Sequence, residues 1–175
     1  MADKNIKFRA IRSTVALPLV LLTIVPAIIL WSTDSFQPGW GFSDWRAYAF
    51  GVLGLLVLGL GLVLLGATIR LFADVGEGTL APWDPPQKLV IVGPYRYVRN
   101  PMHSGAFMAV YGEGLLFGSI PLLIFVTAVF VFHWVYIPLM EERWLTNKFG
   151  EDYKVYKRNV PRWIPRLTPW QGIRE

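Results

Sequence analysis

The chain of 175 residues contains no cysteine and only two histidines, His103 and His133. Without cysteine there is no disulfide, no dithiol redox motif, no iron–sulfur cluster and no thiolate zinc site. Two histidines do not make a histidine-rich metal site, so we expect no metal. Charge is scarce as well, because Asp, Glu, Lys and Arg make up 17% of the residues, against about 25% in a typical soluble domain. These absences argue against disulfide scaffolds, metal sites and cysteine-based redox motifs.

Apolar residues are abundant instead and come in long blocks. They make up 54% of the chain, and the mean hydropathy is +0.42. A membrane-spanning helix needs about 20 mostly apolar residues, and the blocks predict helices at about 15–31, 47–72, 101–117 and 120–140. Glycines and Pro121 indicate a turn between the last two. We therefore predict a single-domain, all-α integral membrane protein with about four transmembrane helices, the last two forming a helical hairpin.

The basic residues predict how these helices are oriented. All 17 Lys and Arg residues except Arg46 lie before the first helix, at the end of the second or between it and the third, or after the fourth. The positive-inside rule makes these segments cytoplasmic, so both termini and a C-terminal helix after residue 140 should be cytoplasmic, as in the inner membrane of a prokaryote. The net charge of +5 is then explained by a basic face opposite anionic lipid, with no nucleic-acid partner.

The first apolar block also fits a signal peptide in its length and its basic flank. The residues that follow it, Trp31-Ser32-Thr33-Asp34, lack a small-x-small cleavage site. We therefore expect this block to be retained as a helix.

Polar residues gather in two segments, 73–104 and 141–166, that flank the predicted hairpin. Because a hairpin brings its own ends together, we expect these segments to meet at the inner membrane face. They would form a composite pocket there, half in lipid and half in the cytosol.

The first polar segment contains a helix-start signature, Asn100-Pro101, with Asn as N-cap and Pro at the first helical position. The free N–H groups of such a turn suit an anion. Arg99 adds a guanidinium fork for a carboxylate or phosphate, and His103 lies one turn further on. A capped membrane helix with interfacial arginines explains the same residues without a ligand.

The second polar segment carries an acid and aromatic residues on one helical face. Their spacing of three or four residues is helical, and the set is Glu142, Leu145, Phe149, Tyr153 and Tyr156. An acid at the membrane end of a helix is costly unless paired, so Arg99 or Arg162 should bind Glu142. The tyrosines also fit an interfacial apolar stripe. A helix break at Gly150 would separate the two halves of the face.

Together the two segments resemble the isoprenylcysteine carboxyl methyltransferases, which are related to the phospholipid N-methyltransferases. The first motif is Gly93-Pro94-Tyr95, Arg99-Asn100-Pro101-Met102 and Gly105; the second is Glu141-Glu142, Leu145, Phe149-Gly150, Tyr153, Tyr156, Val160-Pro161-Arg162 and Ile164-Pro165. The match covers residues 93–166, with both motifs in the family's order and spacing. Asn100 and His103 replace a histidine and a tyrosine of the family pattern, and Arg143 replaces a proline.

The resemblance implies an S-adenosylmethionine-dependent enzyme with its cofactor-binding region in residues 93–166. Glu142 and Arg162 would be the catalytic pair. The cofactor carboxylate would lie at Arg99, Asn100, Pro101 and His103, and its adenine in a slot made by Tyr95, Tyr97, Phe149, Tyr153 and Tyr156. The acceptor would be lipophilic, either an isoprenylcysteine-type carboxylate or a related small lipid, and would enter from the bilayer.

Two other functions remain open from the residues. Membrane reductases that bind a nicotinamide cofactor have a similar C-terminal region, although they have more helices before it. A small non-enzymatic membrane binding protein would also fit. The glycines of the second helix permit close packing or a homodimer face, which nothing else in the sequence indicates.

Overall fold

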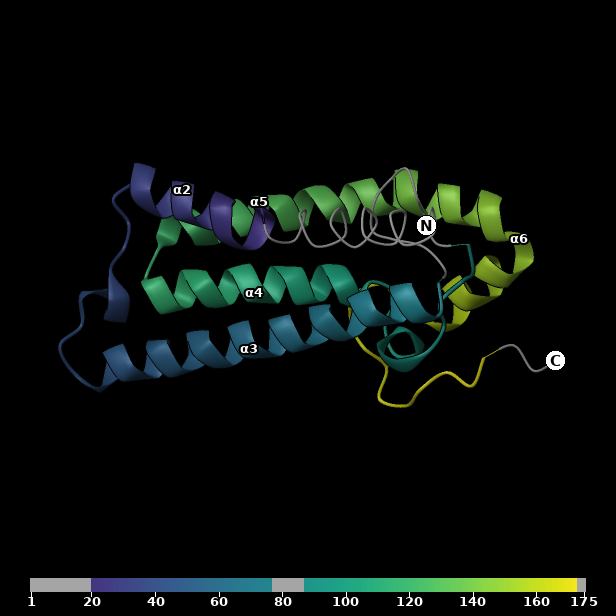
Figure 1. Cartoon of the computed structure of the whole chain (residues 1–175), viewed down its shortest axis with the longest axis horizontal. Helices are drawn as coiled ribbons and strands as arrows, with labels where there is room; N and C mark the ends of the chain where they lie inside the picture. Colours follow the sequence, from purple (N-terminus) through teal and green to yellow (C-terminus); the bar gives the residue numbers. More distant parts are fainter. Residues whose placement is uncertain (1–19, 77–86, 173–175) are drawn as a thin grey trace, which may run out of the picture.

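The computed structural model describes residues 20–76 and 87–172, and all regular structure in these residues is helical (Figure 1). The α-helices are α2 (Val25–Ser32), α3 (Trp45–Asp74), α4 (Pro101–Phe117), α5 (Ile120–Tyr136) and α6 (Glu142–Asn159). The short elements are the π-helices η1 (Val20–Ile24) and η4 (Ile137–Glu141) and the 3-10 helices η2 (Pro38–Gly41) and η3 (Gly93–Arg96). The predicted all-helical class is confirmed for this part of the chain.

Two described helices are long and apolar enough to cross a membrane. One is Trp45–Phe72, within α3, and the other is the continuous run Ile120–Asn159, made by α5, η4 and α6. A shorter apolar helix, Val20–Ser32, lies where the first was expected, and α4 and α5 lie at the third and fourth expected positions. The expected first helix starts at residue 15, so its first five residues lie outside the described part.

The helices lie side by side, with α3 next to α4 and α2 next to α5 (Figure 1). One end of the bundle holds the α4–α5 turn, Phe117 to Ile120, and is called the hairpin end here. The opposite end holds the start of α4 and the whole of α6, and is called the site end. The hairpin therefore brings residues 100 and 142 to the same end, as expected.

Glycines allow α3 and α4 to pack with their backbones in contact. A Cβ atom at Gly61 would lie 2.5 Å from Ala109 N, and one at Gly54 would lie 2.6 Å from Leu116 N. A Cβ at Gly105 of α4 would lie 2.8 Å from Leu65 N. Small residues are the usual means of close helix contact in membranes. These glycines therefore serve packing within the chain.

The hairpin end is closed by hydrogen bonds. Gly118 ends α4 with φ +65°, a conformation that favours glycine, and the Ser119 side chain accepts from Leu122 N at the start of α5. Ser119 Oγ also lies 2.7 Å from Ser35 Oγ. Gln37 N donates to Phe117 O at 2.8 Å. The α2–α3 connection is thereby fixed to the hairpin turn.

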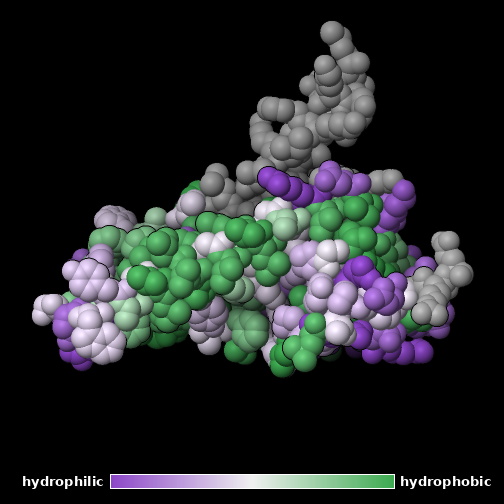
Figure 2. All heavy atoms as spheres, turned by 90° about the horizontal axis from the view of Figure 1, so that it is seen from below, coloured by the Kyte–Doolittle hydropathy of each residue, from purple (hydrophilic) through white to green (hydrophobic). Residues whose placement is uncertain are grey.

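Apolar side chains cover much of the outer surface. Many large ones are exposed along α3 and α5, including Val52, Leu55, Leu56, Leu60, Val63, Ile124, Val131 and Phe132. On the face that Figure 2 shows, hydrophobic residues cover the middle, and hydrophilic residues gather toward the two ends. Such an apolar belt between polar ends is the surface expected of a protein in a bilayer.

Candidate functional site

Glu142 is the centre of the charged cluster at the site end. Its side chain is 2% exposed, and its Oε1 accepts from Arg99 Nη1 at 2.8 Å and from Arg162 Nε at 2.7 Å. Lys157 Nζ lies 2.6 Å from the other oxygen, Oε2. The prediction that Arg99 or Arg162 pairs with Glu142 is confirmed for both arginines. Three cations share one carboxylate, which leaves two positive charges in excess.

The cations keep Glu142 ionised in spite of its burial. Burial alone would raise its pKa, but hydrogen bonds from Arg162 and Lys157 and the charge of Arg99 hold the pKa below the ordinary 4.5. Glu141, the preceding residue, has no such partner. Burial and the charge of Glu142 raise its pKa to about 7. The two adjacent carboxyl groups thus differ in charge near neutral pH.

The start of α4 holds two buried donor groups without partners among the described residues, Arg99 Nε and Asn100 Nδ2. Asn100 occupies the N-cap position as predicted, and its side chain makes no capping hydrogen bond. Its backbone carbonyl instead accepts from Ser104 N and Ser104 Oγ, both at 3.0 Å. Buried donors are rarely left unpaired, so this turn has capacity for an acceptor such as a carboxylate.

Backbone hydrogen bonds join the two polar segments, as the sequence predicted. Arg99 N donates to Pro161 O at 2.9 Å and Arg166 N donates to Tyr97 O at 3.0 Å. Arg96 Nε donates to Trp170 O at 2.6 Å. The chain after α6 therefore returns along residues 96–99 and carries Arg162 to Glu142.

Gly150 breaks α6, with φ +60° and ψ −130°. The face predicted over 142–156 is therefore not that of one continuous helix. The break turns the second half of α6, so Lys157, fifteen residues after Glu142, returns to its carboxylate. The sequence analysis missed Lys157 for this reason.

The aromatic residues of α6 form a packed layer beyond the break. Tyr153 and Tyr156 are each 3% exposed, and Leu145 and Phe149 pack against them. Tyr156 Oη donates to Tyr95 O at 2.7 Å. Burial raises the pKa of Tyr153 to about 12 and that of Tyr95 well above its ordinary value. These hydroxyls are therefore neutral at physiological pH.

The other residues predicted for the site differ in their exposure and in the helix that they face. Pro101 is buried at the start of α4, whereas the Tyr97 side chain is 37% exposed. His103 faces α5, where its ring centroid lies 5.2 Å from that of His133. Trp163 packs against Phe107 and Phe130. Its buried Nε1 has no partner among the described residues.

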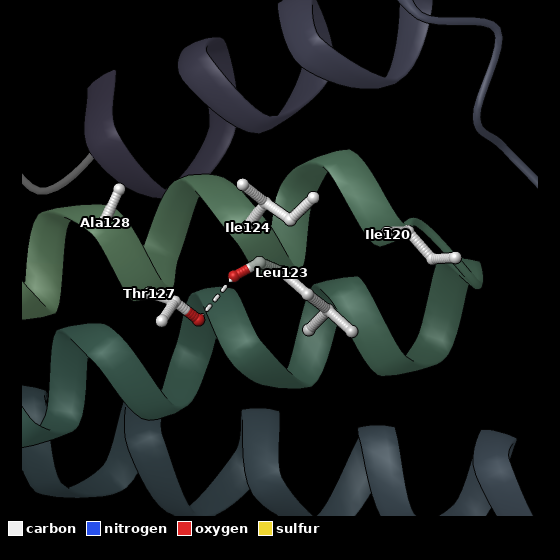
Figure 3. Close-up of a pocket in the computed structure, with 5 residues that line it drawn as sticks. All are labelled: Ile120, Leu123, Ile124, Thr127 and Ala128. Atoms are coloured by element: carbon white, nitrogen blue, oxygen red, sulfur yellow. Dashed lines mark hydrogen bonds between the residues drawn. The ribbon is translucent and has the colours of Figure 1, made fainter.

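Two features lie away from this cluster. Glu113, in the half of α4 toward the hairpin end, has a buried Oε2 without a partner in the described part. A groove on α5 is lined by Ile120, Leu123, Ile124, Thr127 and Ala128 (Figure 3). Thr127 Oγ1 donates to Leu123 O at 2.7 Å. This groove is apolar and lies toward the hairpin end, so it is separate from the charged cluster.

A family model described as phospholipid methyltransferase matches residues 50–152. The chain belongs to this family. The matched region includes the α3–α4 contact and Glu142 together with its partner Arg99. Arg162 lies beyond it, in the returning segment.

Two of three similar curated proteins are named as methyltransferases, and the third as a metal-resistance protein. Protein-S-isoprenylcysteine O-methyltransferase of Schizosaccharomyces pombe is 32% identical over 115 residues, 62% of this chain and 48% of that protein. Cobalt-zinc-cadmium resistance protein CzcN of Cupriavidus metallidurans is 26% identical over 163 residues, 84% of this chain and 74% of that one. Methanethiol S-methyltransferase 1 of Bradyrhizobium diazoefficiens is 31% identical over 71 residues, 41% and 24% of the two chains.

The match spans about half the length of the S. pombe protein. The resemblance that the two motifs carry is confirmed, and the family is one of methyltransferases.

Proposed function

We propose that this protein is an integral membrane enzyme that transfers a methyl group from S-adenosylmethionine to a lipophilic acceptor. The observation that carries the proposal is the Glu142 cluster beside the start of α4, built from both family motifs. Family membership and the named methyltransferase relatives support it. The acceptor would be an isoprenylcysteine-type carboxylate or a related small lipid.

The start of α4 fits the methionine part of the cofactor. A carboxylate there would accept from the unpaired Arg99 Nε and Asn100 Nδ2 and from the first N–H groups of the helix. Pro101 starts α4 and has no N–H of its own, so the backbone donors come from the residues that follow it. The excess positive charge around Glu142 also favours an anionic group.

The aromatic layer fits the adenine. Tyr95, Phe149, Tyr153 and Tyr156 would supply an apolar slot, with Tyr97 at its exposed rim. Since Tyr156 Oη is bonded to Tyr95 O, the Tyr156 hydroxyl would hold the slot in shape and the ring would make the contact. An adenine held in this way aligns the rest of the cofactor with the charged cluster.

When bound, S-adenosylmethionine supplies an electrophilic methyl group on a sulfonium sulfur. The chain's task is then to hold donor and acceptor in line and to exclude water. Glu142 fixes Arg99 and Arg162 in place, and Arg162, 23% exposed, has guanidinium donors left to orient an anionic acceptor. Glu142 and Arg162 are the catalytic pair in this proposal.

The exposed apolar belt supports four membrane-spanning segments, with both termini and α6 on the cytoplasmic side. The basic residues of the site end agree with this orientation, because they would face anionic lipid. The acceptor would reach the site sideways, from the cytoplasmic leaflet.

Calorimetric titration of the detergent-purified protein with S-adenosylmethionine tests the proposal, with a reduced nicotinamide nucleotide as parallel ligand. We expect saturable binding of S-adenosylmethionine alone, lost in Glu142→Ala and Tyr156→Ala. Tyr48→Ala, an exposed substitution at the hairpin end, is the matched control and should bind normally. Binding of the nicotinamide nucleotide alone would indicate a reductase instead.

A further inference from the structure

The chain's only two histidines meet inside the helical hairpin. His103 of α4 and His133 of α5 have ring centroids 5.2 Å apart, and both side chains are half-buried. The Phe107 ring lies against both, at 6.4 Å from His103 and 5.5 Å from His133. Ionisable residues inside apolar helices are costly and usually functional. A pair drawn from two helices is therefore a candidate for chemistry.

The hydrogen bonds leave both rings able to accept a proton. His133 Nδ1 lies 2.8 Å from Val129 O, and since a carbonyl only accepts, Nδ1 carries the hydrogen. Its Nε2 then has a free lone pair in the neutral ring. Neither nitrogen of His103 has a partner within residues 20–76 and 87–172. His103 thus offers an uncommitted base.

The pair borders the charged cluster. His103 follows Asn100 by three residues, which is about 4.5 Å along a helix at 1.5 Å per residue. Phe107 contacts the Trp163 ring at 6.0 Å, and Trp163 directly follows Arg162. The contacting rings of Phe107 and Trp163 therefore connect the histidines to Arg162, the residue proposed to orient the acceptor.

Glu142 is a poor base, because three cations hold it ionised and occupy both of its oxygens. Glu141 is the other candidate for the base. It is half-buried and forms no ion pair with these cations in the described part of the chain, and its position on η4 places it beside Glu142 rather than in the hairpin. The two histidines lie between α4 and α5, whose outer surfaces are apolar.

We propose that His103 takes the proton from a lipophilic thiol acceptor, with His133 as its positioning residue. The proposal rests on the proposed methyl transfer. The S–H bond breaks and its proton goes to the free imidazole nitrogen. The electron pair on the acceptor sulfur forms the new S–CH3 bond, and the pair of the broken C–S bond stays on the donor sulfur.

The charges favour sulfur over the other acceptors. A carboxylate is already ionised and would leave both histidines without a role. An amine acceptor is an ammonium before it loses its proton, and the two excess positive charges around Glu142 repel it. The same charges stabilise a thiolate, as cations next to a cysteine do.

The test compares one alkyl chain carrying a thiol, an amine or a carboxylate, supplied in detergent micelles with S-adenosylmethionine. We expect the thiol to be methylated fastest and His103→Gln to slow this reaction about 10²–10⁴-fold, the usual range for loss of a general base. Affinity for S-adenosylmethionine should change less than about threefold, because His103 is proposed here to serve the acceptor. His133→Phe should lower kcat with little change in KM.

A readout without turnover separates chemistry from folding. Ultraviolet difference spectra should show thiolate when the alkanethiol binds to the wild type without cofactor, and none in His103→Gln. Added imidazole should restore thiol methylation to His103→Ala but not to Glu142→Ala. Glu141→Gln should retain the thiol rate.

The outcomes are distinct. Methylation of the carboxylate alone, or a thiol rate unchanged in His103→Gln, would overturn this inference and leave the proposed function standing. A rate lost in Glu141→Gln and kept in His103→Gln would assign the base to Glu141. Failure to bind S-adenosylmethionine would overturn the proposed function as well.

Discussion

Arg99 and Glu142 are 43 positions apart in the sequence and meet at 2.8 Å, with side chains that are 8% and 2% exposed. Arg99 precedes α4 and Glu142 begins α6, so the pair closes the open end of the α4–α5 hairpin. The same hairpin is closed at its other end by the Ser119 and Gln37 hydrogen bonds. One ion pair therefore joins both family motifs and fixes the geometry of the candidate site.

Glu142→Gln should destabilise the protein strongly. The substitution keeps the shape of the side chain but leaves three cations around a neutral amide. Removing one partner of a buried ion pair typically costs about 3–5 kcal/mol. Thermal unfolding in detergent should therefore show a clearly lower Tm.

Glu151→Gln is the matched control for this change. Glu151 pairs with Lys154 at 3.3 Å in the same helix, but the two side chains are 69% and 50% exposed. Exposed pairs contribute about 0–1 kcal/mol, so its Tm should stay near that of the wild type. Equal losses in the two variants would show that burial of the Glu142 cluster contributes little.

Acid should unfold the protein through Glu142. Its pKa is below 4.5 in the folded state because the hydrogen bonds from Arg162 and Lys157 and the charge of Arg99 outweigh the opposing effect of burial. The unfolded chain then binds the proton more readily, so the stabilisation is present above about 4.5 and is lost as pH falls through the folded pKa.

The measurement is the Tm of wild type and Glu142→Gln at a series of pH values from about 6 down to about 3. Wild type should lose stability over this range more steeply than the variant. Parallel curves for the two proteins would mean that another carboxyl group causes the acid loss.

The sequence was sufficient for the hairpin and for the meeting of its two ends. Apolar runs and a turn set the helices, and a hairpin necessarily brings residue 99 near residue 142. It was not sufficient for the contact of Lys157 with Glu142. The positive φ of Gly150 turns the second half of α6, and no periodicity in the sequence encodes that angle. The sequence also does not place His133 beside His103, since whether His103 faces α5 depends on the rotation of α4 about its axis. That rotation is set by the glycine contacts with α3.

Gly61→Ala should therefore disturb the site as well as the packing. Its Cβ would lie 2.5 Å from Ala109 N and 2.7 Å from Gly105 O, so α3 and α4 must move apart. Overpacking of this kind typically costs about 1–3 kcal/mol. We expect a lower Tm and weaker binding of S-adenosylmethionine.

Gly59→Ala provides the comparison, because nothing lies within 4 Å of its Cβ position. Alanine is the better helix former by about 0.8–1.0 kcal/mol, so this variant should be as stable as the wild type or more so. A Tm loss in Gly59→Ala as large as in Gly61→Ala would contradict the assignment of these two faces of α3.

Tyr156→Phe should separate the hydroxyl of this residue from its ring. Loss of the 2.7 Å bond leaves the Tyr95 carbonyl unpaired in a buried position, which costs about 1–3 kcal/mol. Affinity for S-adenosylmethionine should persist in Tyr156→Phe and disappear in Tyr156→Ala, because the ring makes the proposed contact. Tyr97→Phe, at a 37% exposed side chain, should leave the Tm unchanged.

The orientation of the chain can be tested by single-cysteine labelling, since the native sequence contains no cysteine. Leu167→Cys places a thiol at a fully exposed position after α6, and Ser43→Cys places one in the loop before α3. If the basic site end is cytoplasmic, a membrane-impermeant maleimide added to sealed spheroplasts should label residue 43 and spare residue 167. Inverted vesicles should show the reverse pattern. Labelling of both positions from one side would mean that an even number of spans lies between residues 43 and 167, which would contradict the three spans α3, α4 and α5.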